Sequence, residues 1–339
     1  MRSRLRNSVQ IFRLARDLGL NAASDPLSAI LEFCRARIRG IAAEFGCKTL
    51  EALLDAAAAA VGTCFVEITS DNDLREVRDR YLNQGEKAFA TLCDDLRPDV
   101  LAITFRLTKR KKWQSAYVSI IDCRGEKALR AYYSKWHELA HILTLTDQMR
   151  LVFTRTHAQS ADSRDPEEAL MEVIAGEIGF FDQLVRGDAC EEISFELIDK
   201  LRAKHCPSAS WISSLIGFVN AWPSACFLIT ADLGFKKREA ESLTQDSFAF
   251  ARKPVPELRA LRVSPNAAAR RTGVRIHTNM RVPHQSVIFR AFSRDIAEGQ
   301  AVENLSWWTT SEGERLADQT IMVKVRRFQD GVRALILPL

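Results

Sequence analysis

The spacing of apolar side chains in the first half of the chain changes between a helical period near 3.6 and the alternation that is typical of strands. Asp25 followed by Pro26 is a helix-start signal, and the apolar stripe behind it continues to Ile38. The predicted strands are 64–69, 100–107 and 115–122. Helices are predicted at 72–95, between the first two strands, and at 126–145 and 165–185, after the third. Asp165 is the expected N-cap of the last helix, with Pro166 in its first turn.

Two short apolar segments in the second half predict a pair of helices. They are 208–218 and 223–234, and the break between them contains Asn220 and Pro223. The pattern fits a helix-turn-helix fold, and it fits equally well two packed helices that connect domains. The second segment carries apolar residues such as Cys226 instead of the Arg, Asn or Gln that read bases in a major groove. The sequence therefore predicts a helical, helix-turn-helix-like region and leaves direct DNA binding open.

Beyond a basic, proline-containing linker at 252–256, the pattern changes to strands. The predicted strands are 258–263, 274–279, 286–292, 321–328 and 334–337. Asp330 and Gly331 form a hairpin-turn signal between the last two. The chain is thus predicted to have three parts, which are 1–187, a helical segment at 188–252, and a small strand-rich domain at 257–339.

Composition narrows the class of protein without assigning a function. Of 339 residues, 47% are hydrophobic and 27% are charged, which excludes a disordered chain, a collagen and a disulfide miniprotein. The formal net charge of +5 permits an acidic partner without requiring one. No apolar run approaches the roughly 20 residues of a membrane span, and no signal-peptide core follows the basic N-terminus. We therefore expect a cytoplasmic protein with no membrane contact. The eight cysteines contain no CxxC pair, which argues against a cysteine zinc site or a disulfide framework.

Residues His137-Glu138-Leu139-Ala140-His141 form an HExxH motif inside the predicted helix 126–145. Residues four apart share a helix face, so His137 and His141 can direct ring nitrogens at one metal ion. Glu138 is offset from them and can reach a water in the open coordination position. The alternative is a pair of structural histidines on an ordinary helix. Two of only six histidines, four apart around a Glu, fit that alternative poorly.

A catalytic zinc site needs a third protein ligand besides the two histidines. Metzincins place a histidine six residues past the second His, and that position is Asp147 here. A carboxylate from a downstream helix, as in gluzincins, is the other solution. The helix at 165–185 offers Glu167, Glu168, Glu172 and Glu177. Each of these fits an ordinary solvated helix carboxylate as well.

The motif, the Ile142-Leu143 that follows it, and a Glu-x-x-x-x-x-x-Ala pattern on the downstream helix resemble the ImmA/IrrE metallopeptidase family. The resemblance covers residues 25–185 and implies a zincin-like, α+β peptidase domain that binds Zn²⁺. It implies Glu168 as the third ligand, with Glu172 where the family usually has Asn and Ala175 at the family's Ala. Longer, IrrE-related members add a helix-turn-helix-like segment and a GAF-like sensor domain, and the order of elements here is similar.

By this resemblance we expect a zinc-dependent endopeptidase that makes limited cuts in a helix-turn-helix repressor of the XRE type, in a stress or mobile-element response. Glu138 is the expected general base, and His137, His141 and Glu168 are the expected metal ligands. The strand-rich domain is the expected sensor, with a ligand that the sequence does not identify. The alternative is a non-catalytic regulatory protein that binds DNA or a ligand and keeps a vestigial or structural metal site.

Three further features are weaker candidates. Lys109-Arg110-Lys111-Lys112 is a basic run that could contact nucleic acid, but its place between two predicted strands favours an exposed hairpin tip. His157 could polarise a scissile carbonyl, and a loop histidine without a role is the alternative. Trp307-Trp308 is expected in the core of the strand-rich domain.

Overall fold

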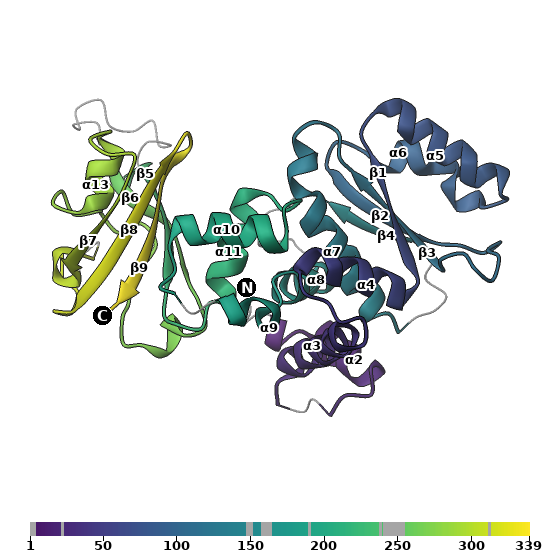
Figure 1. Cartoon of the computed structure of the whole chain (residues 1–339), viewed down its shortest axis with the longest axis horizontal. Coiled ribbons are helices and arrows are strands. Elements are labelled where there is room, and N and C mark those ends of the chain that lie inside the picture. Colours follow the sequence, from purple (N-terminus) through teal and green to yellow (C-terminus); the bar gives the residue numbers. More distant parts are fainter. Residues whose placement is uncertain are drawn as a thin grey trace. The chain divides into compact units, whose positions relative to one another are not determined.

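The computed structural model of the chain describes residues 5–21, 24–146, 152–156, 165–188, 191–236, 239, 255–310 and 313–339. The chain divides into two compact units. The first comprises Met1–Val185 and Lys200–Gly217, and the second comprises Arg186–Asp199 and Phe218–Leu339. Each unit contains one sheet with helices (Figure 1), so the predicted α+β class is confirmed.

The sheet of the first unit has four strands in the order β1-β3-β2-β4. They are β1 (Thr63–Ile68), β2 (Val100–Arg106), β3 (Tyr117–Asp122) and β4 (Val152–Thr156). β1 runs parallel to β3, and the other neighbouring strands are antiparallel. The first three confirm the strands that the sequence predicts, whereas β4 is not predicted by the sequence.

Different helices cover the two faces of this sheet (Figure 1). They are α5 (Asp71–Asn83), η1 (Lys87–Thr91) and α6 (Leu92–Asp95) on one face and α7 (Ala131–Leu143) on the other. Ile103, Phe105 and Ile120 belong to the apolar core that the sheet shares with α5 and α6. Because side chains alternate along a strand, Thr104 and Ser119 point to the opposite face, toward α7.

The first unit contains further helices among the described residues. They are α2 (Val9–Asp17), α3 (Pro26–Glu44), α4 (Leu50–Val61), η2 (Gly125–Arg130), α8 (Pro166–Ile178) and α9 (Asp182–Val185). The predicted starts of two of them, α3 and α8, are confirmed. The Asp25 side chain caps α3 by accepting a hydrogen bond from the Ser28 amide at 3.1 Å. The Asp165 side chain caps α8 in the same way, with Glu167 N 3.2 Å away. The predicted helix 126–145 forms as η2 followed by α7.

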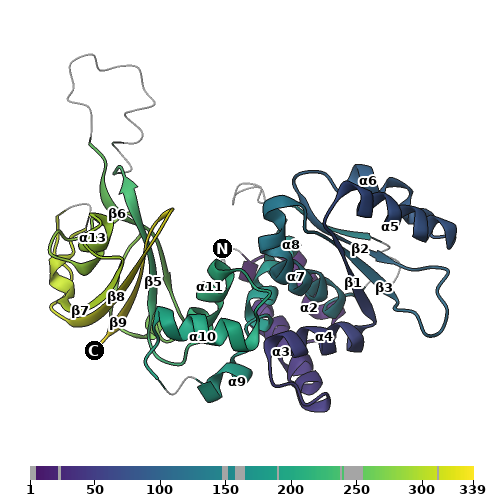
Figure 2. The ribbon, with the colours of Figure 1, turned by 45° about the horizontal axis from the view of Figure 1, so that its top comes forward.

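The second unit contains a five-stranded antiparallel sheet in the order β6-β5-β9-β8-β7 (Figure 2). The strands are β5 (Phe227–Gly234), β6 (Glu257–Pro265), β7 (Glu298–Asn304), β8 (Thr320–Phe328) and β9 (Gly331–Pro338). Helix α13 (Val287–Phe292) packs against β8 and β9. The predicted hairpin is confirmed, because Phe328 pairs with Gly331 across the β8–β9 turn. Gly331 has a φ of 115°, and a Cβ there would lie 2.9 Å from the carbonyl oxygen of Ala231.

Two longer helices and three short ones complete the described elements. They are α10 (Phe195–His205), α11 (Trp211–Ala221), η3 (Arg186–Asp188), η4 (Ala269–Arg271) and η5 (Leu305–Trp307). Helix α11 confirms the first helix of the predicted pair at 208–218. None of the helices that the structure describes combines the length and the apolar character needed to cross a bilayer.

Three predictions in the second half are wrong. The predicted helix at 223–234 is strand β5, the predicted strand at 286–292 is helix α13, and 274–279 contains no strand. Without its second helix, the predicted helix-turn-helix arrangement is wrong as well. The consecutive residues Phe227, Leu228 and Ile229 are all buried, so both faces of β5 are covered. A strand buried on both faces loses its alternation and looks like a short buried helix in the sequence.

β5 falls inside the segment 188–252 that the sequence assigns to helices, yet it pairs with β6 and β9 of the second unit. The predicted linker at 252–256 lies mostly outside the described residues.

Candidate metal centre

The HExxH motif lies on α7, the helix that packs against β2, β3 and β4. Trp136, Leu139 and Leu143 are buried and anchor the helix in the interior of the first unit. His137 and His141 are also buried, with exposed fractions of 0% and 2%. The two imidazoles therefore sit at fixed positions inside the protein, and mobile surface histidines are excluded.

Helix α8 is attached to α7 by two tyrosines that precede the motif. The hydroxyl of Tyr132 donates to the carbonyl oxygen of Gly179 at 2.6 Å, and the hydroxyl of Tyr133 donates to the carbonyl oxygen of Glu172 at 2.6 Å. A Cβ at position 179 would lie 2.9 Å from Cδ1 of Trp136, so the close approach of the chain there requires a glycine. These contacts set the position of α8 along α7.

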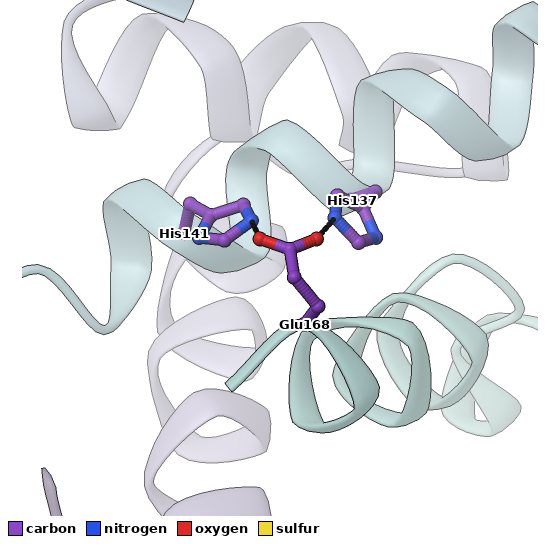
Figure 3. A group of neighbouring side chains, drawn as sticks. All are labelled: His137, His141 and Glu168. Atoms are coloured by element: carbon purple, nitrogen blue, oxygen red, sulfur yellow. Dashed lines mark hydrogen bonds and ion pairs between the residues drawn. The ribbon is translucent and has the colours of Figure 1, made fainter. Parts of the chain in front are cut away.

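This docking brings Glu168 to both histidines of the motif, as Figure 3 shows. Glu168 Oε2 lies 3.2 Å from Nε2 of His137, and Glu168 Oε1 lies 3.2 Å from Nε2 of His141. One donor atom from each of the three residues lies within 4.8 Å of the other two. The three side chains therefore converge on one point and could hold a metal ion.

The chemistry of these donors fits zinc. Zinc in catalytic sites accepts imidazole nitrogens and carboxylate oxygens at about 2.0–2.2 Å in a tetrahedral arrangement. Each histidine contacts a different oxygen of Glu168, and one donor atom from each of the three residues lies within 4.8 Å of the other two. Three protein donors leave one coordination position for water or substrate, which distinguishes catalytic zinc sites from closed structural ones.

The carboxylate of Glu168 is held in its charged form, which is the form that binds metal. Burial raises the pKa of this group, but the hydrogen bonds from His137 and His141 outweigh burial and leave the pKa well below its usual value.

Glu172 lies one helical turn beyond Glu168 and faces a different atom. Its Oε1 is 3.7 Å from Nδ1 of His137, whereas Glu168 approaches Nε2 of that ring. A carboxylate behind the second nitrogen of a metal-binding histidine orients the ring and makes it more basic. Of the other candidates, Glu177 forms an ion pair with Arg35, and the carboxylate of Glu167 does not belong to the group of donor atoms that lie within 4.8 Å of one another. Among the described residues, Glu168 is therefore the carboxylate that completes the donor set.

Glu138 is completely buried and is held from the side of the sheet. Its Oε2 accepts a hydrogen bond of 2.6 Å from the hydroxyl of Thr104 on β2. Thr104 lies 2.7 Å from the hydroxyl of Ser119 on β3, and Ser119 lies 3.2 Å from the hydroxyl of Thr63 on β1. We call Thr104, Ser119 and Thr63 the hydroxyl row, and none of them is predicted as a site residue from the sequence. The available signal is a single Thr or Ser inside each of two apolar runs, 100–105 and 118–121.

The weaker candidates lie elsewhere. The basic run at 109–112 is exposed in the connection between β2 and β3, as expected for a hairpin tip. Trp308 is fully buried in the core of the second unit, while Trp307 is 37% exposed, so the expectation holds for one of the two. His157 and Asp147 lie outside the described residues.

No protein-family model matches this chain, and no curated protein matches it. The resemblance to ImmA/IrrE peptidases stays a prediction based on the residues quoted above.

Proposed function

We propose that this protein is a zinc-dependent endopeptidase of the HExxH type. The observation that carries the proposal is the convergence of Glu168 with His137 and His141, with Glu138 next to His137 on the same helix. A divalent metal with one open coordination position is the usual machinery for peptide hydrolysis by this motif.

The roles of the residues follow from their atoms. Nε2 of His137, Nε2 of His141 and the Glu168 carboxylate would hold the ion, and Glu172 would orient the His137 ring. The ion would supply Lewis-acid activation of a water and of the scissile carbonyl. Glu138 is the proposed general base, whose carboxylate takes the proton from the attacking water and passes it to the leaving amine. Burial of α7 keeps His137, Glu138 and His141 in one arrangement.

The proposed substrate follows from the resemblance to ImmA/IrrE peptidases, which act on helix-turn-helix repressors. We propose limited cleavage of one XRE-type repressor in the cytoplasm, where such repressors act. The strand-rich domain at 257–339, which belongs to the second unit, is the proposed sensor. A separate antiparallel sheet packed with α13 supports a GAF-like domain for that role.

The test is co-expression of the full-length protein with candidate XRE-type repressors, with and without Glu138→Gln. We expect a specific cut that Glu138→Gln abolishes while zinc content stays at one equivalent, because glutamine cannot accept the proton. His137→Ala is expected to lose the zinc. An apo protein purified from zinc-replete medium would rule out the metal site. A zinc-loaded protein that shifts a DNA probe identically with and without Glu138→Gln, and cuts no repressor, would favour the regulatory alternative.

A further inference from the structure

The hydroxyl row crosses three strands beneath the HExxH helix and ends on Glu138. Thr104 and Ser119 are direct partners across the β2–β3 pair, and β3 in turn neighbours β1, which carries Thr63. Thr104, Ser119 and Glu138 are each 0% exposed and Thr63 is 4% exposed, so bulk water does not compete for these hydrogen bonds. Ala102 and Ile121, which lie on that face next to Thr104 and Ser119, are buried apolar residues.

The number of protons fixes the direction of these hydrogen bonds. A hydroxyl has one hydrogen, and Thr104 donates its hydrogen to the Glu138 carboxylate. Ser119 must then donate to Thr104, and Thr63 must donate to Ser119. All three hydrogens point along the row toward the carboxylate, and aligned hydrogen bonds of this kind strengthen one another.

We propose that the hydroxyl row is the positioning element of Glu138. Thr104 fixes the carboxylate directly, while Ser119 and Thr63 fix the rotamer of the Thr104 hydroxyl. The inference rests on the proposed peptidase function, because it assigns the row to the orientation of the general base. Misplacement of a catalytic group by about 1 Å can lower a rate about 100-fold, so one lost hydrogen bond to this carboxylate has a large expected effect.

The kinetic test compares Thr104→Val with Thr104→Ser in the full-length, zinc-loaded protein. Valine keeps the shape and removes the hydroxyl, whereas serine keeps the hydroxyl and is the matched control. We expect Thr104→Val to lower kcat for repressor cleavage about 10- to 100-fold with KM and zinc stoichiometry unchanged, and Thr104→Ser to stay within about 3-fold of wild type. Ser119→Ala is expected to give an intermediate loss of kcat. Thr104 then keeps its hydrogen bond to Glu138 but no longer accepts one from Ser119, so its hydroxyl is less firmly oriented. Equal kcat values for Thr104→Val and wild type would overturn the proposal.

A second readout needs no catalytic activity. Thr104→Val removes the donor to a buried carboxylate and should lower Tm by about 5 °C. In a Glu138→Leu background the same substitution brings two apolar groups together, so it should leave Tm unchanged or raise it. An identical Tm change in both backgrounds would show that Thr104 and Glu138 are not coupled and would overturn the proposal. Failure of the peptidase proposal can be told apart from failure of this one. A zinc-loaded wild type that cuts no repressor would contradict the peptidase function, whereas the Tm values test the coupling of Thr104 to Glu138 independently of activity.

Discussion

At the scale of single residues, two glutamates on the same face of α8 make different contacts at the candidate metal centre. Glu168 and Glu172 are four residues apart, yet the first lies 3.2 Å from Nε2 of each histidine and the second lies 3.7 Å from Nδ1 of His137. We expect the first to act as a metal ligand and the second to orient the His137 ring. The two positions therefore differ in what their removal should do to metal binding.

Glu168→Gln and Glu172→Gln test this difference with the same chemical change. We expect Glu168→Gln to be purified with well under one equivalent of zinc, because a neutral amide is a poor zinc ligand. Glu172→Gln should keep one equivalent but bind it about 10- to 100-fold more weakly, as found when a group behind a ligand is removed. Elemental analysis and competition with a chromogenic chelator measure both quantities. If Glu172→Gln loses the metal and Glu168→Gln keeps it, the ligand assignment is reversed.

The sequence was sufficient for part of this centre. The spacing of His137 and His141 predicts a shared helix face from the geometry of one helix, and the structure places both rings together. The choice of third donor depends on how α8 docks on α7, which two tyrosine hydroxyls and one close glycine decide. The donor of the hydrogen bond to Glu138 depends on strand register, which hydrophobic patterns do not contain.

At the scale of elements, the docking of α8 on α7 can be tested with two glycines close together near its C-terminal end. A Cβ at Gly179 would lie 2.8 Å from the carbonyl oxygen of Ala175 and 2.9 Å from Cδ1 of Trp136, whose side chain is fully buried. A Cβ at Gly176 would meet only the Tyr133 hydroxyl, at an ordinary 3.7 Å.

We expect Gly179→Ala to lower the free energy of unfolding by about 1–3 kcal/mol and to weaken zinc binding, because it pushes α8 away from α7. Gly176→Ala, the control, should be neutral or stabilising by up to about 1 kcal/mol in a helix. Chemical denaturation and zinc titration of the two variants test this prediction. Equal changes in unfolding free energy and zinc affinity for both variants would contradict the close approach at Gly179.

The connection from β3 to the motif helix is held by a buried carboxylate. Asp122 Oδ2 accepts hydrogen bonds from Arg124 Nη2 at 2.8 Å and Lys127 Nζ at 2.6 Å. Burial raises the pKa of Asp122, but the hydrogen bonds from Arg124 and Lys127 outweigh it and hold the pKa below the ordinary 3.8. The stabilisation is therefore fully present above pH 3.8 and is lost as the pH falls through the lowered pKa of the folded state.

Asp122→Asn should lower the free energy of unfolding at pH 7 by about 2–3 kcal/mol, less than for a fully buried pair because both cations are partly exposed. The difference from wild type should shrink as the pH falls from 3.8 through the lowered pKa of the folded state, below which the wild-type carboxyl is neutral as well. Asp71→Asn is the control, because Asp71 also pairs with Arg124 but is exposed, and we expect a loss of at most about 1 kcal/mol. Denaturant unfolding at several pH values measures both variants. A difference for Asp122→Asn that is independent of pH would show that the ion pairs are not its source.

The elements that the sequence misses have a common physical cause. β5 has no alternation because both of its faces are buried, and its partners β6 and β9 come later in the chain. The segment 286–292 is apolar and short enough for a strand, but the Ser286 side chain accepts a hydrogen bond from the Ile288 amide and starts a helix. Short apolar runs do not identify their own secondary structure, so tertiary contacts and caps decide it.

At the scale of the whole molecule, the chain leaves the first unit at residue 185 and returns to it for Lys200–Gly217. The returning segment makes specific contacts there. The Ser208 amide donates to Glu51 Oε1 at 2.9 Å, and a Cβ at Gly217 would overlap the ring of Phe180. Its side chains Leu201, Cys206 and Leu215 are buried. The first unit therefore includes a segment beyond residue 187, the end of the first predicted part.

This arrangement predicts how truncated proteins behave. A fragment that ends at residue 187 keeps all the candidate metal ligands but loses the segment that covers Phe180, and it should expose apolar surface and aggregate or unfold at a lower temperature. A fragment that ends at Ala221, the last residue of α11, keeps that segment and should fold and bind one equivalent of zinc. Size-exclusion chromatography, near-ultraviolet circular dichroism and zinc analysis of the two fragments test the prediction.

The additional substitution Gly217→Val in the longer fragment is the matched control, since it should reproduce the defect of the shorter one by displacing Phe180. If the fragment ending at 187 is as stable and as zinc-loaded as the longer one, the returning segment is not part of the unit that forms the metal centre.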